Sequence, residues 1–189
     1  MQKKNSDKFR GWIAAARSLG YDRILNRACF LTKRTVMEDI DVLIVGAGIS
    51  GIGSACHLLR KCSGKSFTIV EARTEYGGTW DLFRYPGIRS DSDMHTLGFN
   101  FKPWVAEKSI ADGPSIKEYL KETIDENGLA DHIQYETKVM SANWSSEDRV
   151  WRVDIVQNGQ ASQLSCKFLM MCSGYYDYEK PFRPDSKTR

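Results

Sequence analysis

One charge-free segment, residues 42–59, constrains the fold of this 189-residue chain more than any other feature. Its 18 residues contain no Lys, Arg, Asp or Glu, and this length approaches that of a membrane span. Glycines at positions 46, 48, 51 and 53 interrupt it, however, and the apolar run before them favours a strand, whereas the residues after them favour a helix. The segment therefore predicts a buried strand, a glycine turn and a helix, and no membrane partner.

A second apolar run at 67–70 completes a strand–helix–strand unit. The helix is expected to end near Lys61, and the loop 63–65 leads into the second strand. Both strands are continuous apolar runs, which are typical of parallel strands covered on both faces. We therefore predict an α/β fold with a parallel, Rossmann-like nucleotide-binding sheet.

The rest of the chain predicts an inserted helix and a small antiparallel meander. Residues 73–113 are polar, rich in glycine and aromatic residues, and without periodicity, which is typical of a segment that wraps a ligand. A helix is expected at 114–127, because Pro114 suits a first turn and apolar residues recur on one face. Strands are then expected at 133–139, 142–144, 150–156, 163–166 and 168–172, with a hairpin signal at Asn158-Gly159.

The composition is that of a globular protein, but its charges are unevenly placed. Hydrophobic residues make up 41% and charged residues 27% of the chain, and the net charge of +3 is too small to indicate a nucleic-acid partner. Residues 1–36 carry nine Lys and Arg against two Asp. They are consistent with an organelle presequence or with an extension upstream of the natural start near Met37, and we favour the extension.

Cysteine and histidine usage adds two expectations. Five cysteines without a Cys-x-x-Cys pair, in a chain that opens with no secretory leader, predict reduced thiols and a cytoplasmic protein. His57, His95 and His132 are too scattered in the sequence to indicate a metal site. No metal is expected.

The glycine turn has the spacing of a dinucleotide-binding motif. Gly46 would allow the tight turn, Gly48 would let the backbone approach a pyrophosphate, and Gly51 would let the helix pack closely on the strand. Ile49 and Ser50 open the helix, whose free N–H groups and positive dipole end favour an anion. The pattern predicts a phosphate-binding turn.

Glu71 stands at the end of the second expected strand, 25 residues after Gly46. An acid at this position accepts hydrogen bonds from a ribose diol and repels a 2′-phosphate. The sequence therefore favours FAD or NAD over NADP at this turn, although Arg73 lies close enough in sequence to complicate that preference.

Four motifs after the second strand resemble a known family. They are Glu71-Ala72-Arg73, Gly77-Gly78-Thr79-Trp80, Arg84-Tyr85-Pro86-Gly87 and Arg89-Ser90-Asp91, and together they are similar to the FAD-binding half of class B flavin-containing monooxygenases, most closely the Baeyer-Villiger type. The resemblance extends to Val139, on a strand that meets the adenine in the family, and to Cys172-Ser173-Gly174, which occupies the place of a turn that touches FAD. The cofactor-binding residues expected from turn and resemblance together are Gly46, Gly48, Ile49, Ser50, Gly51, Glu71, Ala72, Arg73, Gly78, Thr79, Trp80, Tyr85, Asp91, Val139, Cys172, Ser173 and Gly174.

The resemblance implies an NADPH- and O2-dependent reaction in which reduced FAD activates oxygen for transfer to a ketone, an amine or a sulfide. Asp91 is the residue implied to act catalytically near the flavin. The sequence contains no second Gly-x-Gly-x-x-Gly for NADPH, so we expect an incomplete two-dinucleotide-domain flavoprotein that is not active alone. Its FAD-binding domain is then expected at 37–178 and a truncated tail at 179–189. A non-catalytic FAD-binding fragment and another FAD-dependent oxidoreductase remain the alternatives.

Overall fold

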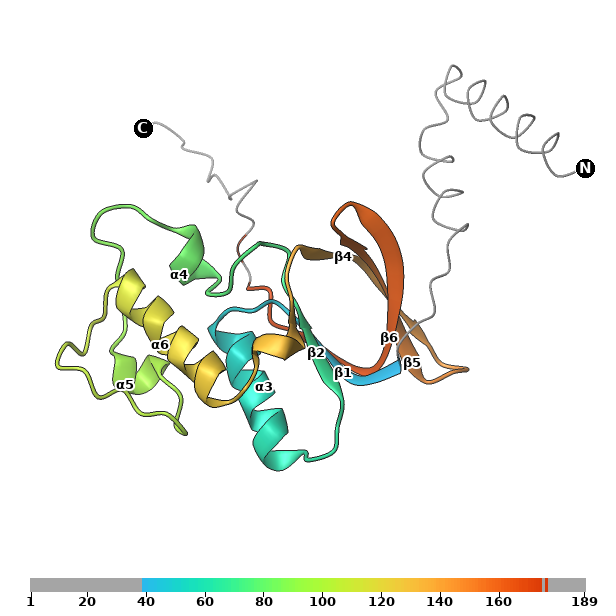
Figure 1. The fold of residues 1–189 in the computed structure, drawn as a ribbon, viewed down its shortest axis with the longest axis horizontal. Helices are drawn as coiled ribbons and strands as arrows, with labels where there is room; N and C mark the ends of the chain where they lie inside the picture. The colour runs from blue at the N-terminus through green and yellow to red at the C-terminus, as the bar shows by residue number, and fades with distance from the viewer. Residues whose placement is uncertain (1–38, 175, 177–189) are drawn as a thin grey trace, which may run out of the picture.

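The computed structural model describes residues 39–174 and 176 (Figure 1). The expected basic extension at 1–36 and the expected tail at 179–189 lie outside these residues. Within the described part, no helix is long and apolar enough to cross a membrane. The charge-free segment forms a strand, a turn and a helix, as predicted.

Six strands form a single mixed sheet with the order β3-β2-β1-β6-β5-β4. Strands β3, β2, β1 and the second half of β6 run parallel, while β6, β5 and β4 form the antiparallel meander. The strands are β1 (Asp39–Val45), β2 (Phe67–Val70), β3 (Ile133–Gln134), β4 (Thr137–Ser145), β5 (Val150–Gln157) and β6 (Gln160–Met171).

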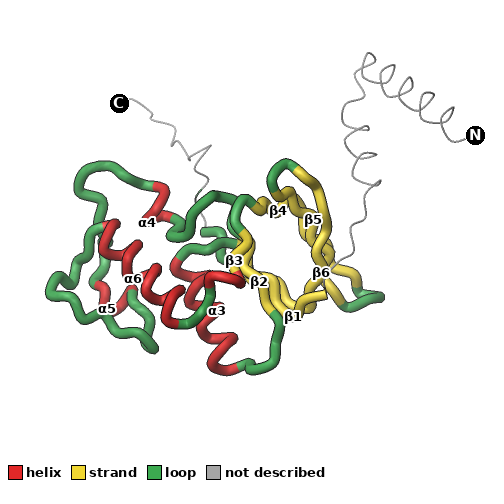
Figure 2. Tube along the Cα trace, in the orientation of Figure 1, coloured by secondary structure: helices red, strands yellow, loops and turns green. Residues whose placement is uncertain are grey.

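Helices cover one face of the parallel strands. Helix α3 (Ile49–Lys61) and helix α6 (Gly113–Glu126) pack beside each other, and the 3-10 turn η1 (Ala130–His132) leads into β3. Val42 and Ile44 of β1 point into this helical core because side chains alternate along a strand. Figure 2 shows the helices gathered on one side of the sheet.

The meander supplies the core on the other face. Leu43 and Val45 pack with Val153 and Ile155 of β5, all of them nearly or fully buried. Strand β1 is thus apolar on both faces for two different reasons: helices cover one face, and the meander covers the other.

One long strand replaces two of the expected ones. The expected strands 163–166 and 168–172 are continuous in β6, and Cys166 pairs with both Trp151 of β5 and Ile40 of β1. The reason is that β6 changes partners at Cys166 without a break in its backbone, so the same strand ends the meander and extends the parallel sheet. The expected segment 142–144 is likewise part of β4.

The expected strand 133–139 divides into two. Tyr135 and Glu136 form a corner between β3 and β4, where Glu136 has a φ of +52°. This corner turns the chain from the parallel strands into the meander. The predicted hairpin is confirmed, because Asn158 and Gly159 alone connect β5 to β6 and both have positive φ.

The segment 73–113 is less irregular than predicted, since it contains α4 (Thr79–Leu82) and α5 (Met94–Leu97). Asp93 caps α5 by accepting from the Thr96 N–H at 2.9 Å. The expected helix at 114–127 is α6, whose cap, Asp112, accepts from the Ser115 N–H at 2.9 Å. Side-chain caps therefore begin both helices.

Candidate functional site

The turn between β1 and α3 is built on two glycines that the protein itself requires. Gly46 has a φ of +105°, and its N–H donates to the Val70 carbonyl at 2.8 Å. A Cβ at Gly46 would lie 2.6 Å from the Cys172 carbonyl oxygen, and a Cβ at Gly51 would overlap the Gly46 carbonyl oxygen. Larger residues therefore do not fit at either position.

Gly48 differs from both of these glycines. Its φ of −82° is open to any residue, and a Cβ would meet nothing closer than the Gly78 Cα at 3.7 Å. It precedes α3, which has no side-chain cap and no acidic residue in its first turn. The leading N–H groups of a helix have no intrahelical partner, so this end attracts an anion. A side chain at position 48 would add atoms at the uncapped start of α3, where glycine adds none.

Glu71 is fixed beside this turn. Its carboxylate is nearly buried, at 7% exposure, and accepts from the Ala47 N–H at 2.8 Å and from the Arg73 N–H at 3.0 Å. Each carboxylate oxygen has two lone pairs, so both can accept a further hydrogen bond. The carboxylate is therefore held rigidly and still able to bind hydroxyl groups.

The Gly77-Gly78 motif lies against the first turn. The Gly77 N–H donates to the Ala47 carbonyl at 2.9 Å. Gly78 has a φ of +54°, and a Cβ there would lie 3.3 Å from the Gly48 Cα. The two predicted glycine motifs thus meet backbone to backbone, with Thr79 and the half-buried Trp80 following at the start of α4.

A charge cluster around the buried Asp81, a residue absent from the sequence-based site, anchors this motif. Asp81 is 2% exposed and forms ion pairs with Arg73, with Arg84 at 3.1 Å and with Lys117 at 2.6 Å. Burial alone would raise the pKa of Asp81, but the Lys117 ammonium and the two guanidinium groups outweigh it and hold the pKa below its ordinary value. Asp81 is therefore a carboxylate at neutral pH. In the sequence, Asp81 is an acid among apolar and aromatic neighbours, and this was the signal that could have indicated a buried charge. Its partner Lys117 lies 36 residues away, so the sequence did not indicate the ion pair.

The Cys172-Ser173-Gly174 segment borders the turn from the other side. The Cys172 N–H donates to the Val45 carbonyl at 2.8 Å, and the Cys172 Sγ lies 3.8 Å from the Ser54 Oγ. Ser173 and Gly174 are exposed beyond it. Val139 lies on β4, pairs with Ile155 and packs on the meander core, near Thr137, whose N–H donates to the Glu71 carbonyl at 2.9 Å.

Three more expected site residues, besides Ser50, Ser173 and Gly174, are open to solvent. Asp91 and Ala72 are exposed, and Tyr85 is 57% exposed. Asp91 lies between Ser90, which hydrogen-bonds Ala111, and Asp93, which caps α5. The structure brings the two glycine motifs and Glu71 together, and it leaves these three side chains on the surface.

The remaining candidate residues have ordinary surroundings. His132 stacks on Phe67 at 4.2 Å, and His57 meets the Phe101 ring edge-on at 5.2 Å. Burial raises the pKa of the Cys56 thiol to about 11, which keeps it protonated and unreactive. Across the described residues, no group of three or more His, Cys, Asp or Glu could hold a metal ion.

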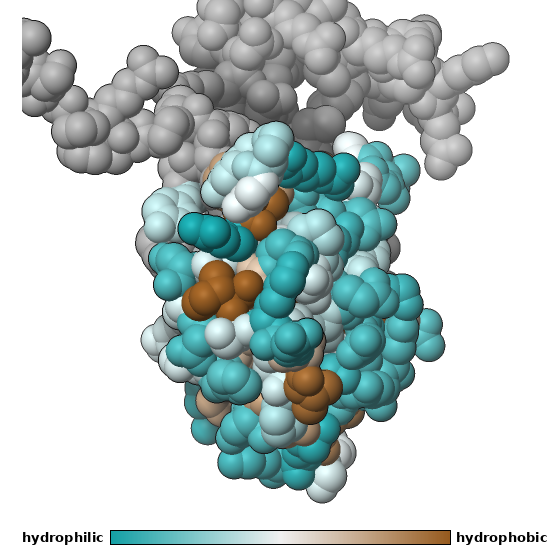
Figure 3. All heavy atoms as spheres, turned by 90° about the vertical axis from the view of Figure 1, so that its left-hand side faces the viewer, coloured by the Kyte–Doolittle hydropathy of each residue, from teal (hydrophilic) through white to brown (hydrophobic). Residues whose placement is uncertain are grey.

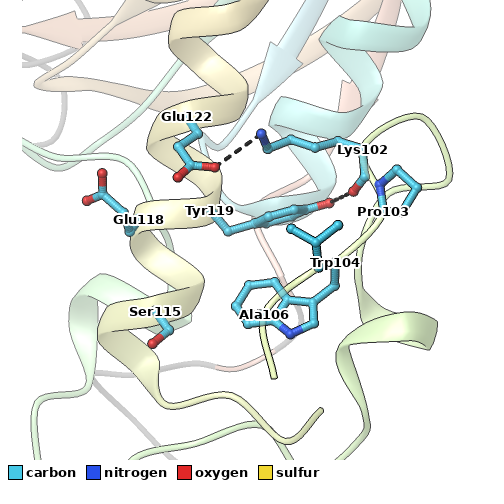
Figure 4. Close-up of a pocket in the computed structure, with 9 residues that line it drawn as sticks. Lys102, Pro103, Trp104, Ala106, Ser115, Glu118, Tyr119 and Glu122 are labelled. Carbon is cyan, nitrogen blue, oxygen red and sulfur yellow. Dashed lines mark hydrogen bonds and ion pairs between the residues drawn. The ribbon is translucent and has the colours of Figure 1, made fainter. Parts of the chain in front are cut away.

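Two hollows are present in the described part of the chain. One, of about 380 Å³, lies along α3 and includes Ile49 and Ser50 of the expected site. The other, of about 270 Å³, lies between α6 and residues 102–106 and contains none of the expected site residues. Figure 4 shows it, with Lys102 reaching Glu122 and the Tyr119 hydroxyl donating to the Lys102 carbonyl. The view of the molecule in Figure 3 is largely hydrophilic, with separate apolar patches.

Sequence comparisons agree with this geometry. A family model described as an NAD(P)-binding Rossmann-like domain matches residues 44–121. The chain is 54% identical over 147 residues to the FAD-containing monooxygenase EthA of Mycobacterium tuberculosis (strain H37Rv), an alignment that covers 78% of this chain and 30% of that protein. It is 53% identical over 148 residues to the probable FAD-binding monooxygenase AlmA of an Acinetobacter species, with the same coverage. The chain therefore spans about 30% of the length of these relatives.

Solved structures show the same relationship. A steroid monooxygenase bound to NADP is 32% identical, with a TM-score of 0.65, over 72% of this chain and 26% of its own. Cyclohexanone monooxygenase from Rhodococcus sp. Phi1 bound to NADP+ is 27% identical, with a TM-score of 0.67, over 79% and 28%. The predicted Rossmann-like α/β fold is confirmed, and so is the predicted resemblance to the N-terminal part of flavin monooxygenases.

Proposed function

We propose that this chain, a homologue of the N-terminal part of flavin monooxygenases of the Baeyer-Villiger type, binds FAD as the cofactor-binding portion of such an enzyme. One observation carries the proposal: Gly48, against which Gly78 packs, precedes the uncapped N-terminus of α3, and the Glu71 carboxylate is fixed beside this turn. Pyrophosphate and ribose are adjacent groups in FAD, so one dinucleotide can use both features.

Each part of the site would hold one part of the cofactor. The first-turn N–H groups of α3, at Ile49 and Ser50, would donate to the pyrophosphate, whose charge the helix dipole stabilises. Glu71 would accept from the ribose hydroxyls. A 2′-phosphate would be repelled by this carboxylate, which favours FAD over NADP at this turn.

FAD, when bound, would supply the redox chemistry and the activation of O2. Thr79 and Trp80 would then lie along the ribityl chain and the ring, because Gly78 holds the start of α4 against the first turn. Asp91 would act near the flavin. It is exposed here, so that role requires the cofactor or further polypeptide to cover it.

Oxygen transfer is proposed for a complete enzyme rather than for this chain alone, because the chain spans about 30% of its relatives. The substrate classes proposed are ketones, amines and sulfides. The NADPH site is proposed to lie outside this sequence, which contains one Gly-x-Gly-x-x-Gly motif. We therefore expect no NADPH oxidation by the purified chain.

The test is retention of flavin. The purified chain is incubated with FAD and passed through a gel-filtration column, and the visible spectrum of the protein peak is recorded before the released flavin is identified by chromatography. The proposal predicts a yellow protein that carries FAD. A folded but colourless protein, as judged by far-UV circular dichroism, would contradict it.

A further inference from the structure

Arg73 connects the two carboxylates at this site. Its backbone N–H donates to the Glu71 Oε1 at 3.0 Å, while its guanidinium donates to the Gly78 carbonyl at 3.2 Å and forms an ion pair with Asp81. Because the Glu71 Oε1 lies only 3.0 Å from the Arg73 backbone nitrogen, the Glu71 carboxylate is within the length of an arginine side chain. Asp81 and Glu71 are thus two acids within reach of one guanidinium.

Burial and a fixed carboxylate favour the contact with Asp81. Asp81 is 2% exposed, and low-dielectric surroundings strengthen its ion pairs. Arg84 and Lys117 contact the same carboxylate, and the Lys117 ammonium also lies 3.5 Å from Glu75. The Asp81 carboxylate is therefore held in place by several partners before Arg73 binds it. Glu71 is held by two backbone N–H groups instead, and its remaining lone pairs are those that ribose hydroxyls would use.

We propose that Asp81 is a positioning residue for FAD binding: it holds the Arg73 guanidinium on Gly78 and so leaves the Glu71 carboxylate free to accept the ribose hydroxyls. This inference rests on the proposed function. Released from Asp81, Arg73 would pair with Glu71, neutralise it and occupy its lone pairs. Arg73 would also leave the Gly78 carbonyl, which it now holds beside Gly48.

The test compares four proteins in a double-mutant cycle: the natural chain, Asp81→Asn, Arg73→Met, and the double variant. FAD dissociation constants are measured by flavin fluorescence, and folding is checked by circular dichroism and thermal unfolding. We expect Asp81→Asn to weaken FAD binding by about tenfold or more. Arg73→Met should weaken it by about threefold or less, because the contacts with Gly78 and Asp81 are lost while the Glu71 carboxylate stays free. The double variant should bind like Arg73→Met, since no guanidinium is left to capture Glu71.

Lys121→Met is the matched control. Lys121 lies one turn further along α6 than Lys117, is half-exposed and pairs with Asp125 at 2.6 Å. Its loss removes a lysine from the same helix without affecting Asp81, so the FAD dissociation constant should stay at the natural value.

Three results would overturn the inference. Unchanged binding in Asp81→Asn would show that Asp81 does not position the site, and a double variant weaker than both single ones would show that Asp81 acts through packing alone. A loss of tenfold or more in Arg73→Met would show that Arg73 contacts FAD itself. This variant keeps Asp81 paired with Lys117 and Arg84, so it tests the role assigned to Arg73 even if Asp81→Asn does not fold. A natural chain without affinity for FAD would instead overturn the proposed function, and this inference with it.

Discussion

In the turn between β1 and α3, the outer glycines, Gly46 and Gly51, are required for a different reason from the middle one, Gly48. At Gly46 and Gly51 a Cβ would collide with backbone carbonyl oxygens of the protein itself. At Gly48 a Cβ would make ordinary contact with the Gly78 Cα at 3.7 Å, and the backbone is open to any residue. The outer positions therefore require glycine for the fold, whereas the middle position requires it only when a ligand approaches. The comparison separates stability from binding within six residues.

Gly51→Ala should have the largest effect. The added methyl group would overlap the Gly46 carbonyl oxygen, and backbone atoms cannot move aside as a flexible side chain can. We expect the free energy of unfolding to fall by about 3 kcal/mol or more, measured by urea denaturation. The neighbouring Ser50→Ala is the control, because Ser50 is exposed and its change should cost little. A Gly51→Ala protein as stable as the natural chain would remove the distinction between the outer and middle positions.

Gly48→Ala should change the stability little and the FAD affinity strongly. The methyl group fits the protein, so the free energy of unfolding should change by about 1 kcal/mol or less, the usual cost of alanine at a helix N-cap. The same methyl group takes the space proposed for the pyrophosphate, and FAD should bind at least about tenfold more weakly. Both quantities are measured on one preparation, by denaturation and by flavin fluorescence.

Glu71→Gln should lower both the free energy of unfolding and the FAD affinity by a moderate amount. The amide keeps the size of the carboxylate but loses its charge, and because its NH2 group cannot accept, one of the two hydrogen bonds from Ala47 and Arg73 is lost. Charge-assisted hydrogen bonds are the stronger kind, so we expect a loss of about 1–2 kcal/mol in the free energy of unfolding, and weaker FAD binding. Unchanged FAD affinity would exclude the ribose contact.

Asp41 provides the smallest effect and a control at the far end of β1. A hydrogen bond from the Lys167 ammonium, followed by one from the Ser66 N–H, lowers the pKa of Asp41 to about 2. An unfolded aspartate has a pKa of about 3.9. The folded chain therefore binds this proton more weakly than the unfolded chain does, so the stability that Asp41 contributes is present above about pH 4 and is lost as the pH falls towards 2.

Asp41→Asn should therefore flatten the pH dependence of stability between about pH 4 and pH 2, measured by thermal unfolding across that range. FAD binding at neutral pH should not change, since Asp41 lies at the opposite end of the strand from the glycine turn. A variant that lost FAD affinity would show that stability and binding are coupled along β1.

Local sequence determined which parts of this site could be predicted. The strand, the turn and the helix at 42–59 follow from adjacent residues, and Asn158-Gly159 is a hairpin signal complete in itself. Strand β6 could not be predicted as one piece, because Cys166 changes its partner strand without any change in local pattern. The corner at Glu136 contains no glycine, so the local sequence does not indicate the positive φ there.

The charge cluster around Asp81 could not be predicted from the sequence for a related reason. Asp81 lies between two of the predicted motifs, but its role depends on Lys117 of α6, which only the tertiary fold brings to it. Arg73 could be identified as a residue near Glu71, but the sequence alone did not indicate which groups its side chain contacts. The structure turns its guanidinium towards Gly78 and Asp81.

Thermal unfolding of the natural chain and of Gly48→Ala, each with and without saturating FAD, tests the central claim most directly. A ligand that binds only the folded state raises its stability, by about 2.7 kcal/mol at a hundred times the dissociation constant. We predict that FAD, at a hundred times the dissociation constant of the natural chain, raises the unfolding temperature of the natural chain by at least about twice as much as that of Gly48→Ala, although the two unfold at similar temperatures without it. Equal stabilisation of both proteins, or of neither, would contradict the assignment of this turn as the FAD phosphate site.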